Sequence, residues 1–122
     1  MKLGRKITGG KYHKLSKKKK YSLRGEERKV KLREIKKKII RGLGGNKRTI
    51  NLSSNVVNVI NPETNKAKKV KILNVLETPS DRFLARQNVL VKSAIIETDL
   101  GKARITNRPS QEGSVQAVLL KE

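Results

Sequence analysis

Residues 56–75, which read VVNVINPETNKAKKVKILNV, decide the fold that this chain can adopt. β-Branched residues are frequent in residues 56–60 and again in residues 67–75. The six residues between them include Asn61, Pro62 and Asn65, which are residue types that favour turns. Because β-branched residues favour strands, this stretch predicts an antiparallel β-hairpin.

The sequence on either side of this hairpin predicts further short strands. Downstream, residues 89–98 and 102–106 flank the turn Asp99-Leu100-Gly101, and a last strand is expected over residues 115–120. Residues 78–87 are expected to form a loop with one short helical turn. Upstream, residues 39–52 run through Gly42-Leu43-Gly44-Gly45-Asn46, and this Gly-rich stretch favours a second hairpin.

So many short strands in one small chain indicate a mainly β fold. Six or seven antiparallel strands must close on themselves to cover their edges and to enclose a core. We therefore expect a small antiparallel β-barrel, although strand order cannot be read from the pattern. A chain of 122 residues has room for a single domain.

Residues 26–38 fit two structures about equally well. As a helix, the segment starts with acidic residues and places Glu27 and Lys31 at i,i+4 spacing. As strands, Val30 and Leu32 alternate with basic residues, which is the period of a half-buried strand. The pattern alone leaves both structures open.

Positive charge is concentrated at the amino end. The chain carries 31 basic and 10 acidic residues, for a formal net charge of +21. Residues 1–48 hold 20 of the basic residues but only Glu26, Glu27 and Glu34 as acids, a net charge of +17. Such a charge exceeds what solubility requires and indicates a polyanionic partner.

Residues 1–25 are expected to be a basic arm, and residues 26–122 the β-barrel domain. The arm contains four glycines and the run Lys17-Lys18-Lys19-Lys20, with almost no apolar periodicity. A segment of this kind cannot bury enough apolar surface to offset the entropy lost on ordering. We therefore expect the arm to be disordered alone and to become ordered along a bound polyanion.

The residues that carry catalysis or metal binding are scarce. The chain has no cysteine, which excludes disulfides and thiolate chemistry, and His13 is its single histidine, surrounded by lysines. The stretch Gly4-Arg5-Lys6-Ile7-Thr8-Gly9-Gly10-Lys11-Tyr12 departs from a phosphate-binding P-loop, because Gly10 and Tyr12 break the motif. We expect no enzymatic activity, no cofactor, no metal site and no small-molecule substrate.

Nucleic acid fits this charge better than a membrane does. No stretch approaches about 18 consecutive apolar residues, and no basic segment carries the apolar face of an interfacial helix. The first residues also lack the apolar core of a signal peptide, so a cytoplasmic location without membrane contact is expected. Tyr12, Tyr21 and Phe83 are the only aromatic residues, which indicates binding through phosphates, sugars and shape rather than stacking.

The candidate RNA-binding residues lie in the arm, at Arg28 just after it, and in and beside the Gly-rich turn. Lys supplies point charges and Arg supplies forked donors for phosphate oxygens. The candidates are Lys2, Arg5, Lys6, Thr8, Gly9, Gly10, Lys11, His13, Lys14, Lys17, Lys18, Lys19, Lys20, Tyr21, Arg24, Arg28, Arg41, Asn46, Lys47 and Arg48.

Several segments together resemble a known family. They are Gly4-Arg5-Lys6 followed by Thr8-Gly9-Gly10-Lys11, Lys18-Lys19-Lys20-Tyr21 before Arg24, Gly44-Gly45-Asn46-Lys47, Ala94-Ile95-Ile96-Glu97-Thr98, Gly101-Lys102-Ala103-Arg104-Ile105-Thr106, and Arg108-Pro109. With these landmarks the chain resembles, over nearly its whole length, small-subunit ribosomal protein eight of the archaeal and eukaryotic type. The bacterial protein of that number is unrelated. The absence of the long insertion of eukaryotic members makes the chain similar to archaeal members.

The resemblance implies a β-barrel domain that lies against small-subunit ribosomal RNA, with the amino-terminal extension threaded into the RNA and no catalytic role. It also implies neighbouring ribosomal proteins as partners, and we expect no homo-oligomer. Because the Gly-Gly-Asn of the family is a turn between strands, the resemblance favours strands around Ile39 and Leu52. A helix over residues 26–35 remains the alternative. The rival function is a non-ribosomal nucleic-acid chaperone or chromatin protein with the same charge and no fixed site.

Overall fold

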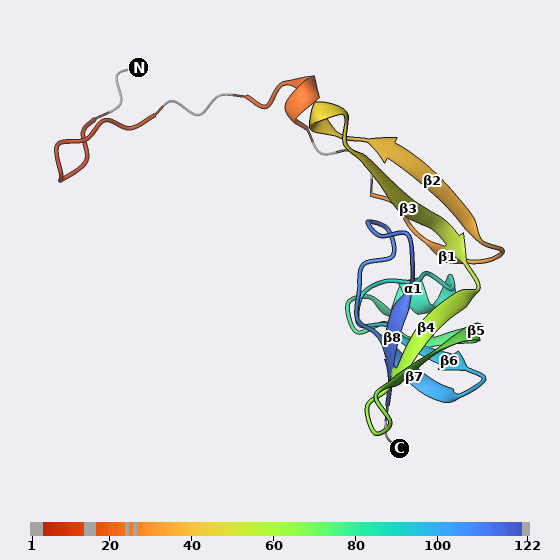
Figure 1. The fold of residues 1–122 in the computed structure, drawn as a ribbon. Helices are drawn as coiled ribbons and strands as arrows, with labels where there is room; N and C mark the ends of the chain where they lie inside the picture. The colour runs from red at the N-terminus through yellow and green to blue at the C-terminus, as the bar shows by residue number, and fades with distance from the viewer. Residues whose placement is uncertain (1–3, 14–16, 24, 26, 121–122) are drawn as a thin grey trace.

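The protein consists of a closed β-barrel and a second, smaller sheet that extends from it (Figure 1). The computed structural model describes residues 4–13, 17–23, 25 and 27–120. Within these residues the barrel is formed by β4 (Val56–Asn61), β5 (Lys66–Glu77), β6 (Ile95–Thr98), β7 (Gly101–Ile105) and β8 (Gln116–Leu119). The smaller sheet contains β1 (Lys31–Leu32), β2 (Lys36–Arg41) and β3 (Lys47–Ser54), in the order β1-β3-β2.

The hairpins predicted from local sequence are confirmed. Strands β4 and β5 pair antiparallel from Val56 opposite Lys71 to Asn61 opposite Lys66. Strands β2 and β3 pair antiparallel around the Gly-rich turn, where Leu43–Gly45 forms the short 3-10 helix η2. The β6–β7 hairpin turns through Gly101, whose φ of 116° lies in the region that favours glycine.

The barrel differs from the expected antiparallel barrel of six or seven strands in its number of strands and in the direction of one pair. Five of the described strands close it, and the closing pair β4·β8 is parallel. The other three strands form the separate sheet. When five strands follow one another as antiparallel neighbours, the first and the last run in the same direction. The pair that closes the barrel, β4 with β8, is therefore parallel.

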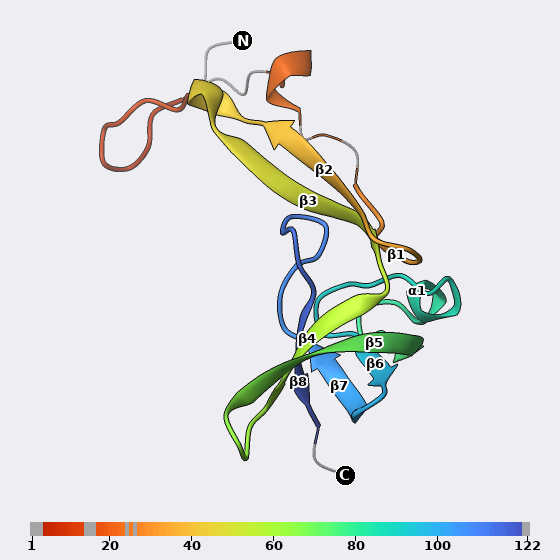
Figure 2. The same ribbon diagram turned by 45° about the vertical axis from the view of Figure 1, so that its right-hand side comes forward.

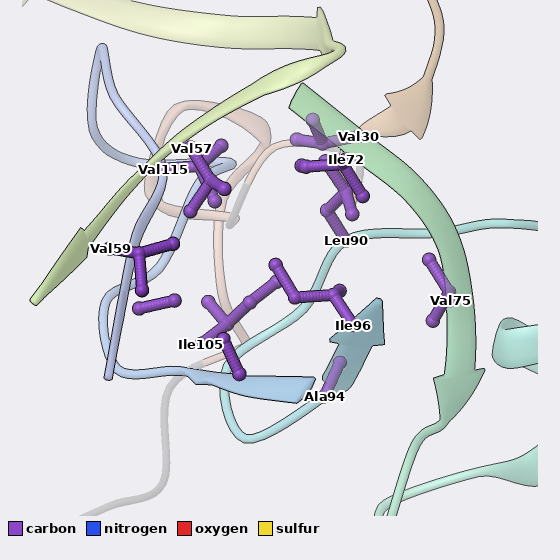
Figure 3. Close-up of a cluster of buried hydrophobic side chains, with 12 residues drawn as sticks. Val30, Val57, Val59, Ile72, Val75, Leu90, Ala94, Ile96, Ile105 and Val115 are labelled. Carbon is purple, nitrogen blue, oxygen red and sulfur yellow. The ribbon is translucent and has the colours of Figure 1, made fainter. Parts of the chain in front are cut away.

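The core lies inside the barrel and includes residues from every barrel strand (Figure 3). Val57 and Val59 of β4 point toward Ile96 of β6 and Ile105 of β7, and all four side chains are at most 1% exposed. Val30, which precedes β1, is fully buried in the same cluster. Burial of a branched aliphatic side chain stabilises a fold by about 1.5–3 kcal/mol, so this cluster is the main source of stability.

The alternative helix over residues 26–35 is not present in the described part of that segment. Instead the chain is extended, and the Val30 carbonyl accepts a hydrogen bond from Leu90 N at 2.7 Å. Strand β1 then pairs parallel to the end of β3. Burial of Val30 in the barrel therefore outweighs the local preference for helical i,i+4 pairs, which contribute only about 0.2–0.5 kcal/mol each.

The predicted strand over residues 89–98 was too long. Strand β6 covers only Ile95–Thr98. Before it, Lys31 and Val89 form an isolated antiparallel bridge beside β1, and Ser93 adopts a φ of 69°, which turns the chain into β6. The apolar residues of 89–98 therefore belong to two segments that run in different directions, one on each side of the turn at Ser93.

A short helix and two 3-10 turns complete the described structure. The predicted helical turn in residues 78–87 is confirmed as α1 (Arg82–Arg86), whose first turn is capped by Asp81 Oδ1 accepting from Phe83 N at 2.8 Å. In the arm, η1 (Lys20–Ser22) is the second 3-10 turn. None of the helices in the described residues has the length and apolarity needed to cross a bilayer.

Candidate nucleic-acid interface

Strands β2 and β3 form a two-stranded ribbon that extends away from the barrel, seen clearly in Figures 1 and 2. We call residues 36–54 the ribbon. Its end near the barrel is buried, with Ile50 fully buried and Asn51 1% exposed. Its far half is exposed, and Leu43 at the tip is 94% exposed. Half of the ribbon therefore belongs to the folded core and half is available to a partner.

The exposed charged side chains of the ribbon are all positive. Lys36, Lys37 and Lys38 lie on β2 opposite the buried end of β3, and Arg41, Lys47 and Arg48 lie at the far end. No acidic residue occurs in the sequence between Glu34 and Glu63. Because strand side chains alternate, Lys37 and Arg41 lie on one face of the ribbon, and Lys38 and Arg48 lie on the other. Both faces thus present positive charge.

A loop from the barrel holds the ribbon at its buried end. We call residues 107–114 the bracing loop. Asn51 N donates to the carbonyl oxygens of Glu112 at 3.2 Å and Pro109 at 3.4 Å. Gly113 packs against Thr49 so closely that a Cβ added to Gly113 would lie 3.2 Å from Thr49 Cγ2. These contacts fix the direction in which the ribbon leaves the barrel.

The bracing loop is itself held by a carboxylate. Glu112 Oε2 accepts from Asn107 Nδ2 at 2.8 Å, and Glu112 Oε1 accepts from Arg108 N at 3.5 Å. Asn107 also donates to the Ser114 carbonyl at 2.8 Å and accepts from Gln116 N at 3.0 Å. The Glu112 and Asn107 side chains therefore connect the bracing loop to the start of β8.

A small groove lies where the ribbon meets the barrel. Its volume is about 190 Å³, and its lining includes Lys37 of β2 and Lys69 of β5 together with Asn51 and Ser54 of β3. Asn51 Oδ1 is buried there and has no hydrogen-bond partner among the described residues. The groove extends the positive surface of the ribbon onto the barrel wall.

The described part of the arm contains a tight local turn. Arg5 and Lys11 form an antiparallel bridge, and Gly9 N donates to the Lys6 carbonyl at 2.9 Å. Arg5 Nη1 donates to the Gly9 carbonyl at 3.1 Å, and Lys6 Nζ lies 5.7 Å from the centre of the Tyr12 ring. Every residue from 4 to 13 is exposed. That the arm is disordered without a partner stays a prediction.

The rest of the described arm is also exposed. Lys17, Lys18, Lys19 and Lys20 lead into η1, where Tyr21 is 90% exposed and Leu23 beyond it is 57% exposed. The candidates Lys2, Lys14 and Arg24 lie outside the described residues. His13 is exposed, and the described residues contain no group of three or more His, Cys, Asp or Glu side chains that could hold a metal ion.

The structure brings some of the candidate residues together and separates others. Arg41, Asn46, Lys47 and Arg48 all lie at the far end of the ribbon. Arg28 is differently placed, because it is half-buried and its Nε donates to the Ser110 carbonyl at 3.5 Å. Arg28 therefore has a structural contact with the bracing loop.

The sequence reasoning missed two groups of basic residues. Lys36, Lys37 and Lys38 lie on the exposed ribbon, and Lys69 lines the groove beside it. The run of lysines in β2 lay in the segment where helix and strand were both open, which concealed its place on a projecting hairpin. Lys69 becomes part of the site only through the packing of the barrel against the ribbon.

These features define a small basic β-barrel protein with a positively charged ribbon and arm. The chain belongs to the family described as ribosomal protein S8e, whose model matches residues 1–120. It is 44% identical to the small ribosomal subunit protein eS8 of Methanococcus aeolicus and 44% identical to that of Sulfolobus acidocaldarius. It is 42% identical to that of Sulfurisphaera tokodaii. Each alignment covers 97% of this chain and 93% of the relative.

Membership of this family makes the protein a structural component of the ribosome and not an enzyme. The resemblance found in the sequence is thereby confirmed. The relatives named above come from archaea, as the length of the chain suggested.

Proposed function

We propose that the protein is a structural constituent of the small ribosomal subunit, in the cytoplasm, and binds small-subunit ribosomal RNA through phosphate-backbone contacts of its arm and ribbon. In this role the barrel anchors the ribbon, and the ribbon and arm together hold RNA segments in place and so support translation. Neighbouring ribosomal proteins are further partners. We expect neither homo-oligomers nor membrane contact.

One observation carries the proposal. A projecting ribbon, rigidly braced at its base, presents lysine and arginine on both faces with no acidic residue along its length. Without an anionic partner, such a surface repels itself at a cost in stability. RNA phosphates remove that repulsion and release their own counterions, which gives a favourable free energy of binding.

The binding mode follows from the kinds of side chain present. The ribbon carries no aromatic residue, so a platform of stacked bases cannot form on it. The lysines and arginines instead reach phosphate oxygens, and Asn46 and Thr49 can bond to sugar hydroxyls. Recognition of the RNA therefore depends on its folded shape more than on its base sequence.

Salt dependence of binding tests this proposal. If the arm and ribbon neutralise on the order of ten phosphates, log K against log salt concentration should have a slope near −7 to −9 for transcribed archaeal small-subunit ribosomal RNA. Deletion of residues 1–24 should flatten the slope markedly. The substitution Lys36→Gln/Lys37→Gln/Lys38→Gln should flatten it by roughly two to three units.

A matched control uses three lysines of β5 that lie outside the groove. The triple substitution Lys66→Gln/Lys68→Gln/Lys71→Gln removes the same charge from exposed positions on the barrel. It should change the slope by much less than the ribbon variant. Equal slopes for the two triple variants would assign the effect to net charge and remove the ribbon from the proposal.

The rival function, a free nucleic-acid chaperone or chromatin protein, predicts a different distribution in the cell. A ribosomal constituent sediments stoichiometrically with small subunits at moderate salt. A chaperone without a fixed site would be spread over nucleic acid and released from subunits. Quantitative detection of the chain across a sucrose gradient separates the two functions.

A further inference from the structure

Two loops of this chain share one sequence pattern. Residues 5–11 read RKITGGK and residues 41–47 read RGLGGNK. In both, the first residue is Arg, the third is aliphatic, the fifth is Gly and the seventh is Lys. One loop lies in the arm and the other forms the tip of the ribbon.

The two loops also share three features of backbone geometry. Arg5 pairs antiparallel with Lys11, and Arg41 pairs antiparallel with Lys47. In each, the amide of the second residue donates to the carbonyl of the sixth, at 2.9 Å in the arm and 2.6 Å in the ribbon. The fifth residue has positive φ in both, 81° for Gly9 and 76° for Gly45, a conformation that favours glycine. The turns between these shared points differ, because Gly9 N donates to the Lys6 carbonyl in the arm, whereas the ribbon forms η2 with Gly44 also at positive φ.

Each loop directs an aliphatic side chain into solvent at its apex. Ile7 is fully exposed, and Leu43 is 94% exposed. Glycines follow both apices, since Gly44 and Gly45 come directly after Leu43, and Gly9 and Gly10 come one residue after Ile7. Nothing in the described structure covers either side chain, so both are available to a partner.

Each loop also places two positive charges opposite one another. Residues that pair directly across two antiparallel strands have Cβ atoms about 4.5–5.5 Å apart, and like charges at such positions are destabilising. The chain contains this unfavourable arrangement twice, as Arg5 with Lys11 and as Arg41 with Lys47. A single anionic group between the Arg and Lys side chains would attract both of them and so replace their repulsion by two attractive contacts.

From this repeat we infer that residues 5–11 and 41–47 are two copies of one RNA-contact unit, in which the Arg–Lys pair holds a single phosphate and the aliphatic apex packs on the face of an unpaired base. The inference rests on the proposed function and specifies its chemistry at two sites. The apex adds an apolar contact with a base to the one that the exposed ring of Tyr21 offers in the arm.

RNA fits these loops better than a protein partner does. The apolar surface of each apex is a single side chain, whereas the fully buried centre of a protein interface is depleted in charge and built from several apolar residues. One apolar side chain beside two cations matches one nucleotide, which combines an apolar base face with one phosphate charge. An acidic protein segment would satisfy the cations and leave Ile7 and Leu43 exposed.

The number of phosphates held by each pair can be measured from the salt slope of RNA binding. The double variants Arg5→Gln/Lys11→Gln and Arg41→Gln/Lys47→Gln should each reduce the slope by about 0.7–0.9, the value for one phosphate. The control Lys36→Gln/Lys38→Gln removes two cations of the same ribbon that are not paired with each other. Its reduction should be about twice as large, because each lysine contacts its own phosphate.

Charge reversal gives a readout that a folding defect cannot imitate. Lys47→Glu places opposite charges across the last pair of the ribbon, so the melting temperature of the free protein should rise while RNA affinity falls. Lys47→Gln should raise the melting temperature less and weaken binding less. A fall in both quantities for Lys47→Glu would contradict the like-charge argument.

The apex contact is tested separately from charge. Leu43→Ser and Ile7→Ser should each weaken binding about fivefold, as expected for loss of roughly half the burial of an aliphatic side chain, with an unchanged salt slope. Leu73→Ser removes an exposed aliphatic side chain of barrel strand β5, 57% exposed, and should bind as the unsubstituted protein does. Equal affinities for Leu43→Ser and Leu73→Ser would overturn the apex contact.

The outcomes distinguish this inference from the proposed function. If the unsubstituted protein binds ribosomal RNA with a steep salt slope and both loop double variants match it, the contact units are wrong and the proposed function stands. If the unsubstituted protein shows no salt-dependent binding, the proposed function itself is wrong.

Discussion

Gly113 of the bracing loop lies against Thr49 of β3, at a separation where a Cβ on Gly113 would be 3.2 Å from Thr49 Cγ2 and 3.3 Å from Thr49 Cβ. This contact joins the barrel to the ribbon at residues that are 64 positions apart in the sequence. The absence of a side chain at residue 113 lets the two segments approach and so sets the direction of the ribbon.

Substitution of Gly113 should therefore disturb the ribbon. Gly113→Val is expected to destabilise the protein by about 1–3 kcal/mol, because overpacking at a close contact forces the neighbouring atoms apart. Chemical denaturation measures the change, and Gly25→Ala, whose added Cβ meets no atom within 4 Å, serves as the control. The double variant with Thr49→Ser should recover part of the loss, because it removes the methyl group involved.

Loss of the Glu112 carboxylate should loosen the bracing loop. Glu112→Ala removes the acceptor of the bonds from Asn107 Nδ2 and Arg108 N, and hydrogen bonds to a charged group contribute about 1.5–3 kcal/mol each when well formed. Because Glu112 and Arg108 are exposed, we expect a net destabilisation of about 1 kcal/mol. Amide exchange of Asn51 should become faster in this variant, and an unchanged rate would show that the loop does not depend on Glu112.

The barrel and the far half of the ribbon should respond differently to truncation of an isoleucine. Ile96→Ala, at a fully buried position of β6, is expected to cost about 2–5 kcal/mol, the range for such a deletion in a core. Ile39→Ala, at an exposed position of β2, should cost less than about 0.5 kcal/mol. Calorimetric melting of the two variants tests where the stability of the protein lies.

The free arm should differ from the barrel in its dynamics. We expect narrow, poorly dispersed amide signals for residues 1–25 without RNA and well-dispersed β signals beyond Asn55. Addition of ribosomal RNA should broaden or shift the arm signals first. Dispersed arm signals in the absence of RNA would show that the turn at residues 5–11 is stable by itself and that the arm does not order on binding.

Local sequence predicted the elements whose contacts are local. The β4–β5 hairpin could be predicted because its turn residues and its two β-branched runs lie within twenty residues. The basic arm could be predicted because charge is a property of composition. The strand over residues 89–98 was predicted too long, because the left-handed conformation of Ser93 leaves no mark on the apolar pattern.

The candidate site was predicted only in part for the same reason. Arg41, Lys47 and Arg48 were recognised from their place beside the Gly-rich turn. The RNA contact of Arg28 stays a prediction, and its Nε bond to the Ser110 carbonyl, across 82 positions of sequence, could not be predicted from local pattern. Glu112 was not singled out in the sequence, because its bonds to Asn107 and Arg108 exist only in the folded loop.

The sequence by itself determined that this chain is a β protein with a positive amino end, because hydrophobic period, turn residues and charge are all read over short windows. Tertiary structure decided that β4 and β8 close the barrel in parallel, that β2 and β3 leave the barrel as a ribbon, and that Gly113 meets Thr49. Each of these relations joins residues far apart in the chain, and it is the burial of Val30, Val57 and Ile105 in one shared core that brings their segments together.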